Sequence, residues 1–271
     1  MPEPARPEGP TEILRPFWAE AEIPTERWPY LEFSARRYPP IARALSAVAP
    51  LGDRRVLDLG GGVGGLAVVL HAWLGGSYEL AEFSAPTEPH MNALRARGVT
   101  GGHRVDLTAL RPLEGLPDDY DGILFVEVLE HLLVNPLLLF RDVWDHLKPG
   151  GFLFLTTPNM ARLGSRMRLL AGRSIKEVGR YPLRPGEVMG HVVEYTRAEL
   201  DQILTTEGFA PASHRVIQQV PAVRPSALQR LGVRLLNWDA LARFELGDDI
   251  LALYRKVERH APVIRDASGR L

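Results

Sequence analysis

The chain of 271 residues has no cysteine, no excess of one charge and no long apolar run. Without cysteine, disulfides, thiolate metal sites and cysteine nucleophiles are excluded. A formal net charge of -1 gives no overall attraction to nucleic acid or to an anionic membrane. No stretch approaches the length that spans a bilayer, and the proline-rich N-terminus lacks an apolar signal core. We therefore expect a cytoplasmic protein without transmembrane segments.

A glycine-rich stretch between Arg55 and Gly65, R-V-L-D-L-G-G-G-V-G-G, is the centre of the sequence. The apolar residues before it predict a buried parallel strand, and the apolar spacing after it predicts a helix. The glycines between them indicate a loop where backbone passes close to a ligand. The helix end that follows has free N–H groups and a partial positive charge, which favour a carboxylate or phosphate.

The core is predicted to alternate strands and helices, which favours a parallel sheet covered on both faces. We expect strands at 54–59, 77–82, 103–106, 121–126 and 152–156, with two last strands at 213–219 and 249–255. Helices are expected at 64–73, 86–96, from Asn135 to the K-P-G-G of 148–151, from Thr196 to Gly208, and over much of 226–244.

The expected organisation has four parts. Residues 1–50 form a disordered lead and a helical cap rich in aromatic residues, and 51–159 form the cofactor-binding core. Residues 160–192 form a basic insertion or lid, with seven basic side chains against two acidic ones, and 193–271 complete the core and form a tail. A charge-rich surface helix is the simplest interpretation of the insertion, and a wall that binds anionic or lipid-linked acceptors is the alternative.

Gly60, Gly62 and Gly65 satisfy the G-x-G-x-x-G pattern of dinucleotide-binding proteins, and Glu82 follows at the spacing of a ribose-binding acid. Asp58 extends the pattern to D-x-G-x-G-x-G. Three further motifs follow in order: F-V-E-V-L-E-H-L, L-K-P-G-G-F-L-F-L-T-T-P-N and G-H-V-V-E-Y-T-R-A-E-L.

Together these motifs resemble the class I S-adenosylmethionine (SAM) dependent methyltransferases. The resemblance is to the group that includes ubiquinone-type O-methyltransferases and bacterial sugar, lipid and natural-product enzymes. It implies an α/β, Rossmann-like, seven-stranded and mostly parallel sheet with helices on both faces, an N-terminal helical cap and a helical insertion after the fifth strand. The implied cofactor is SAM, and the implied reaction is O-methylation of a small-molecule, sugar or lipid-linked acceptor.

The residue types suit the parts of SAM. Glycine lets backbone approach the methionine and ribose, an acid near the ammonium supplies charge, and a carboxylate has two acceptor oxygens for the ribose diol. An aromatic ring can lie against adenine, and a further acid and amide can meet its amine. The expected cofactor residues are Asp58, Gly60, Gly61, Gly62, Gly64, Glu82, Phe83, Asp106, Leu107 and Glu127.

A second set of residues, E-x-x-E-H followed by a distant histidine, is the candidate catalytic site. If the chain is helical there, Glu127, Glu130 and His131 share one face and can meet His191. Two carboxylates and two imidazoles suit Mg or another divalent cation, including zinc. The pattern also resembles the metal site of small-RNA 2'-O-methyltransferases. Without metal, His131 or His191 is the expected general base, and purely structural histidines are the third interpretation.

Three other functions share parts of these patterns. A nicotinamide dehydrogenase shares the glycine loop, although not the later motifs. A metal-dependent RNA ribose 2'-O-methyltransferase shares the metal residues, but the balanced charge makes nucleic acid an unfavourable partner. A non-catalytic SAM-binding protein shares the cofactor residues alone. The sequence indicates neither the acceptor nor the oligomeric state.

Overall fold

The computed structural model describes residues 8–48, 51–175, 190–218, 227–236 and 244–259. Its strands are β1 Gly52–Leu59, β2 Gly75–Glu82, β3 Val99–Arg104, β4 Tyr120–Val126, β5 Leu147–Pro158, β6 Phe209–Ile217 and β7 Asp249–Lys256. Its helices are α1 Pro10–Glu20, α2 Trp28–Ala35, α3 Tyr38–Val48, α4 Gly65–Leu74, α5 Glu88–Arg95, α6 Pro136–Asp145, α7 Leu163–Leu170, α8 Arg197–Thr206 and α9 Ala227–Leu236, with short 3-10 turns η1 Thr25–Arg27 and η2 Leu129–His131.

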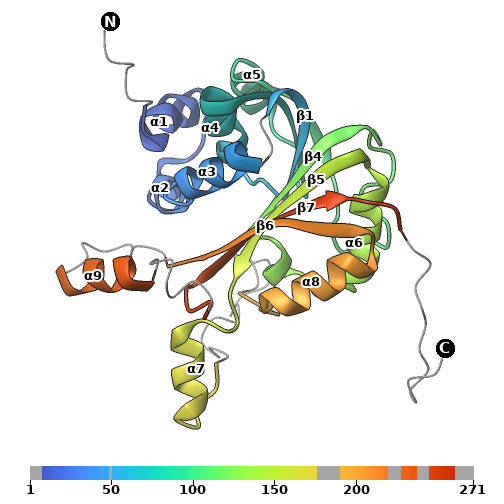
Figure 1. Ribbon diagram of the computed structural model, residues 1–271. Helices are drawn as coiled ribbons and strands as arrows, with labels where there is room; N and C mark the ends of the chain where they lie inside the picture. The colour runs from blue at the N-terminus through green and yellow to red at the C-terminus, as the bar shows by residue number, and fades with distance from the viewer. Residues whose placement is uncertain (1–7, 49–50, 176–189, 219–226, 237–243, 260–271) are drawn as a thin grey trace, which may run out of the picture.

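The strands form one seven-stranded sheet in the order β3-β2-β1-β4-β5-β7-β6 (Figure 1). The pairs from β3 to β5 are parallel, whereas β7 lies antiparallel between β5 and β6. The strand order reverses direction between β1 and β4, and ligands of open α/β sheets bind at the carboxyl ends of the strands at such a point. The predicted Rossmann-like fold class is therefore confirmed, including the antiparallel last strand β7.

Two apolar layers cover the sheet because successive strand residues point to opposite faces. On one face, Val56 and Leu80 pack with residues of α1 to α5, and on the other, Leu57 and Phe125 pack with α6 and α8. The cap helices α1 to α3 therefore belong to the same core as α4. This packing holds the start of α3 near the carboxyl ends of the central strands.

Several predicted boundaries of strands and helices were wrong. β3 spans Val99–Arg104, because glycines 101 and 102 are accommodated within the strand. Asp106, expected as its last residue, follows the strand instead. α6 ends at Asp145, and the K-P-G-G expected to stop it lies inside β5, with Gly150 in a left-handed conformation. β6 spans 209–217 and not 213–219. The expected caps at Asn135 and Thr196 are confirmed by their side-chain hydrogen bonds.

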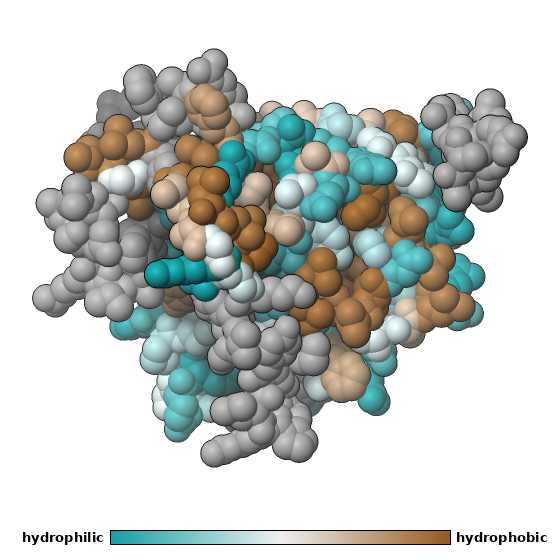
Figure 2. Space-filling view, turned by 90° about the horizontal axis from the view of Figure 1, so that it is seen from below, coloured by the Kyte–Doolittle hydropathy of each residue, from teal (hydrophilic) through white to brown (hydrophobic). Residues whose placement is uncertain are grey.

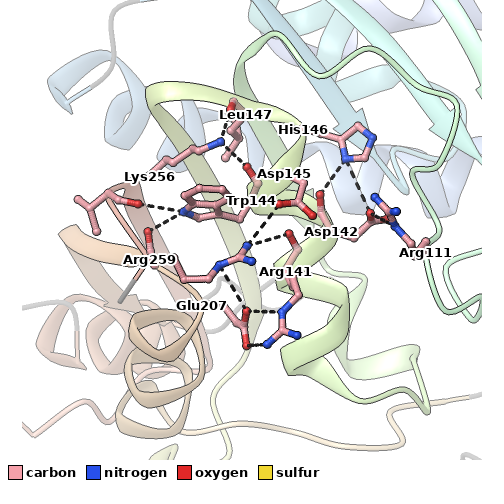
Figure 3. A network of polar contacts seen from close by, with 12 residues as sticks. Arg111, Arg141, Asp142, Trp144, Asp145, His146, Leu147, Glu207, Lys256 and Arg259 are labelled. Atoms are coloured by element: carbon pink, nitrogen blue, oxygen red, sulfur yellow. Dashed lines mark hydrogen bonds and ion pairs between the residues drawn. The ribbon is translucent and has the colours of Figure 1, made fainter. Parts of the chain in front are cut away.

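A polar network fastens the end of β7 to α6 and α8 (Figure 3). The Trp144 ring lies between two cations, with Lys256 Nζ 3.7 Å and the Arg259 guanidinium carbon 4.3 Å from its centre. Its indole N–H donates to the carbonyls of Gly208 and Val257, at 3.0 Å each. Cations over an indole face are attracted by the ring's quadrupole. The segment after β7 is thereby held at the amino end of β5, away from the glycine loop.

Part of the notable sequence lies outside the described residues. The start of the expected disordered lead is residues 1–7. Much of the basic insertion is residues 176–189, and the end of the expected tail is residues 260–271. Within the residues that the structure describes, no helix is long and apolar enough to cross a membrane.

Candidate active site

The glycine loop between β1 and α4 forms the floor of the candidate cofactor site. Gly60, Gly62 and Gly64 all have positive φ angles, of 76°, 62° and 76°. A Cβ atom at Gly61 would overlap the Asp58 carboxylate, whereas one at Gly62 would meet nothing within 4 Å. Gly62 is therefore required by its conformation and faces open space. A ligand can approach the backbone there without meeting a side chain.

Glu82, at the end of β2, holds this loop. Its Oε1 accepts a hydrogen bond of 2.6 Å from the Gly62 N–H, and its Oε2 accepts one of 3.0 Å from the Phe83 N–H. Each carboxylate oxygen has a second acceptor site, so both can still receive a hydroxyl. The carboxylate therefore points into the loop, as expected for a residue that holds a ribose diol.

Asp58 lies directly below the loop and has the most unusual environment in it. Its side chain is buried, and neither carboxylate oxygen has a hydrogen-bond partner among the described residues. Burial, reinforced by the charge of Glu82, raises the pKa of Asp58 to about 7, although the Ala67 amide opposes the shift. A buried acid without a partner in the free protein is suited to meet a cation or an N–H group of a ligand.

The state of Asp58 gives a pH-dependent prediction. The pKa of Asp58 in the folded protein lies above its ordinary value, so the folded protein holds this proton more tightly than the unfolded chain does. The free energy of unfolding therefore falls as the pH rises from the ordinary pKa toward 7. We expect Asp58→Asn to stabilise the ligand-free protein, and by about 2 kcal/mol more at pH 8 than at pH 5. Thermal unfolding at both values measures this difference. The exposed Asp118→Asn is the control, and a gain that is equal at both pH values would contradict the assignment.

The remaining expected cofactor residues follow β2 and β3 on the same side of the sheet. The Phe83 ring is 61% exposed and lies 5.8 Å from the Arg104 guanidinium, which leaves a ring face open. Asp106 Oδ1 accepts hydrogen bonds from the Thr108 amide and hydroxyl, which lower the pKa of Asp106. Leu107 is half-buried against the core. The structure thus brings these residues to the carboxyl ends of β2 and β3.

The backbone at Glu127 is not helical, contrary to the expectation from the sequence. It follows β4 with a φ of 56°, and the chain then forms the 3-10 turn η2 and not an α-helix. Its Oε1 accepts from the Thr156 hydroxyl at 2.8 Å, and its Oε2 lies 3.4 Å from an Arg37 nitrogen. The expectation of one helical face for Glu127, Glu130 and His131 was therefore wrong.

Three of the four expected metal ligands do come together. Glu130, His131 and His191 each offer an atom within 4.8 Å of the others, and Glu127 stands outside this group. The two imidazole rings lie edge to face with centres 5.2 Å apart. Since the Val192 N–H donates to the Glu130 carbonyl at 2.7 Å, the backbone itself brings His191 to the turn. We refer to Glu130, His131 and His191 as the histidine cluster.

Glu130 is fully buried in this cluster. Its Oε2 accepts from the Thr157 hydroxyl at 3.0 Å, while its Oε1 has no hydrogen-bond partner among the described residues. Burial and the charge of Glu127 raise the pKa of Glu130 well above its ordinary value. An unpartnered carboxylate oxygen beside two imidazoles fits the donor set of a divalent cation.

Glu194, which was not among the expected site residues, orients His191. Glu194 Oε1 lies 3.0 Å from His191 Nδ1, and Oε2 forms a 2.5 Å ion pair with Arg162. Although burial opposes it, hydrogen bonds from His191 and Arg162 lower the pKa of Glu194 to about 2. Since a carboxylate only accepts, His191 Nδ1 donates in this hydrogen bond, and the matching neutral tautomer has its lone pair on Nε2. The H-x-x-E spacing was the available signal.

Arg37 was also missed, because it lies in the turn between α2 and α3, far from the motifs in the sequence. Its guanidinium contacts Glu127 and lies 4.0 Å from the Asp249 carboxylate at the start of β7. These groups border a small cleft beside the histidine cluster, lined by Arg37, Ile41, Glu127, Thr156, Ile217, Asp249 and Leu251. Burial and the charge of Glu127 raise the pKa of Asp249, while Arg37 opposes the shift. The cleft therefore has charged groups from the cap, β4 and β7.

A glycine loop over a buried acid, a carboxylate at the end of β2 that holds this loop, and this sheet topology define the class of SAM-dependent methyltransferases with a Rossmann-like fold. The chain belongs to the methyltransferase domain family, whose model matches residues 30–214. The assignment of the protein as a methyltransferase is thereby confirmed, and the nicotinamide dehydrogenase alternative is set aside.

Individual relatives are more distant. The ubiquinone biosynthesis O-methyltransferase of Parvibaculum lavamentivorans is 33% identical over 115 residues, which cover 42% of this chain and 44% of that protein. The chain thus matches less than half the length of this curated relative. A SAM-dependent methyltransferase of Mesorhizobium loti superposes with a TM-score of 0.52 at 21% identity, covering 82% of this chain and 98% of its own. A methyltransferase in complex with the Haloferax volcanii Trm112 activator superposes with a TM-score of 0.57 at 16% sequence identity. The superposition covers 89% of this chain and 98% of that one.

Proposed function

We propose that the protein transfers the methyl group of SAM to a hydroxyl oxygen of a small, sugar or lipid-linked acceptor. The observation that carries the proposal is the histidine cluster at the carboxyl end of β4, next to the strand that ends in the glycine loop. Two imidazoles and a buried carboxylate are suited to a proton-bearing acceptor. The partial likeness to a ubiquinone biosynthesis O-methyltransferase supports the same chemistry.

The proposed cofactor residues fit the parts of SAM by their chemistry. When bound, SAM supplies a methyl group already activated by a sulfonium. Gly60, Gly61, Gly62 and Gly64 would offer backbone to its methionine and ribose, and Glu82 would accept the ribose hydroxyls. Asp58 and Glu127 would meet the ammonium, while Phe83, Asp106 and Leu107 would border the adenine. These residues orient the reaction, which needs nucleophile and leaving group in line.

The histidine cluster would handle the proton of the acceptor. His191 keeps Nε2 as a base because Glu194 holds the other ring nitrogen, and His131 faces it edge to face. A hydroxyl that binds between the cluster and the loop would lose its proton to one of these rings as methyl transfer proceeds. Glu130 beside the two rings is shielded from water, so its carboxylate interacts more strongly with a neighbouring proton or cation than it would at the surface.

A divalent cation is the second way in which this cluster can act. Glu130, His131 and His191 would hold it, and it would supply a Lewis acid that lowers the pKa of the acceptor hydroxyl. We expect exhaustive chelation to lower turnover by at least ~10-fold if this is so, with recovery on adding Mg²⁺, Mn²⁺ or Zn²⁺. Turnover that chelator leaves unchanged would assign the proton to the histidines alone.

The proposal is tested by product analysis. The protein is incubated with SAM and a panel of a catechol, a phenol, a hydroxylated sugar and a short RNA, and S-adenosylhomocysteine is measured. Mass spectrometry then locates the added methyl on oxygen, carbon or nitrogen. Methyl on a catechol or sugar oxygen supports the proposal, whereas RNA ribose methylation alone supports the nucleic-acid alternative. SAM binding without product from any acceptor supports a non-catalytic SAM-binding protein.

A further inference from the structure

Helix α7 presents its apolar side chains to solvent and packs on the molecule through a small polar residue. Leu163, Met167 and Leu170 lie on one helical face at i, i+4 and i+7, and they are 38%, 57% and 82% exposed. Ser165, in contrast, is 1% exposed. An amphipathic helix of a globular protein normally turns its apolar face inward. The orientation of α7 is therefore the reverse of what packing alone would select.

The charged residues of α7 and those next to it in the sequence are all basic. Arg166, Arg168 and Arg173 follow in or just after the helix, and the sequence has no acidic residue from 160 to 176. Arg166 and Arg168 donate to backbone carbonyls, and none of the three has a carboxylate in salt-bridge distance within the described part of the chain. The net charge of -1 for the whole chain shows that this excess is local.

A second helix has the same character. Leu231 and Leu235 of α9 are 51% and 49% exposed, and Arg234 stands between them in sequence. Both α7 and α9 project from the body of the protein (Figure 1). The view from below shows apolar groups on this side, interspersed with polar ones (Figure 2). We use the name basic apolar surface for the exposed stretches of the two helices taken together, residues 163–173 and 231–235.

We infer that the basic apolar surface docks the protein on an anionic lipid bilayer. Exposed leucine and methionine side chains enter the boundary between headgroups and acyl chains, and the arginines meet anionic headgroups while their stems cover apolar surface. An anionic bilayer accommodates both features at once, because it offers a broad apolar phase bordered by negative charge. The inference does not depend on which acceptor is methylated.

The surface is linked directly to the candidate active site. Arg162, the residue before α7, forms the ion pair with Glu194 that in turn holds His191. The first residue of α7 is held as well: the Leu163 N–H donates at 2.9 Å to the carbonyl of Leu246, which lies shortly before β7. Docking through α7 would thus set the histidine cluster close to the bilayer surface.

Vesicle sedimentation tests the inference with the full chain. We expect binding to phosphatidylcholine vesicles containing phosphatidylglycerol, and at least ~10-fold weaker binding to phosphatidylcholine alone. The double variant M167S/L170S should lose at least ~10-fold in affinity, and R166Q/R168Q should lose about fivefold per arginine and most of the salt dependence. Leu110→Ser, which alters a leucine that is 74% exposed in another loop, should bind as the wild type does.

Three results with vesicles would overturn the inference. They are the absence of vesicle binding by the wild type, equal binding of charged and neutral vesicles, and unchanged binding by M167S/L170S. A wild type that is dimeric in solution and becomes monomeric in that variant would assign the surface to a second copy of the chain instead. SAM affinity measured by calorimetry checks that each variant is folded, since none of these residues belongs to the cofactor site.

Discussion

Replacing Glu82 by alanine is expected to weaken SAM binding by more than ~10-fold, which isothermal titration calorimetry measures directly. The substitution removes both proposed acceptors of the ribose hydroxyls. It also leaves the Gly62 and Phe83 N–H groups without the carboxylate that now joins them. The loss therefore combines a missing ligand contact with a less ordered loop.

Two further variants separate these effects. Glu82→Gln retains one acceptor oxygen but presents an NH₂ group to one of the two backbone donors, so we expect an intermediate loss. Glu88→Ala removes an exposed carboxylate from α5, whose partner Arg95 lies 3.4 Å away, and should leave SAM affinity unchanged. Wild-type affinity in Glu82→Ala would show that the cofactor binds elsewhere or not at all.

The second large effect is expected at the histidine cluster. His191→Ala should lower the rate of methyl transfer by at least ~100-fold, because it removes either the base or a metal ligand, while SAM affinity stays within a factor of about two. Single-turnover kinetics with saturating SAM measure the chemical step. The pH profile of His191→Ala should also lose the limb that reports the imidazole.

Glu194→Gln provides the matched comparison. It keeps the shape of the side chain but removes the charge that fixes Nδ1–H of His191 and pairs with Arg162. A positioning role predicts a smaller rate loss than for His191→Ala and a shifted pH profile. Equal and pH-independent losses in both variants would indicate that the segment is only structural, with no part in proton transfer.

The parts of the site that could be predicted from sequence are those in which neighbouring residues act together. The glycine loop and Glu82 belong to a β-α-β unit, in which spacing along the chain fixes spacing in space, and the structure joins them at 2.6 Å. The motif with two carboxylates was also expected to follow the fourth strand, and Glu127 and Glu130 do follow β4. Its local conformation was not predicted, because the left-handed backbone of Glu127 has no signature in the sequence.

The contacts that sequence analysis missed join distant elements. Arg37 and Glu127 come from the cap and the end of β4, and Asp249 joins them because β7 lies next to β5. Sequence spacing carries no information about such an encounter. The same holds for the exposed leucines of α7, whose periodicity predicts a helix but does not reveal which face turns to solvent.

The position of β7 has a consequence for biosynthesis. β5 pairs with β4 on one side and with β7 on the other. β7 can take its place between β5 and β6 only after residues 249–256 have left the ribosome. Until then the growing polypeptide carries an open edge on β5, which is the type of edge that pairs with other chains. We therefore expect nascent chains stalled before residue 249 to require chaperone protection, although the glycine loop and Glu82 have long been synthesised.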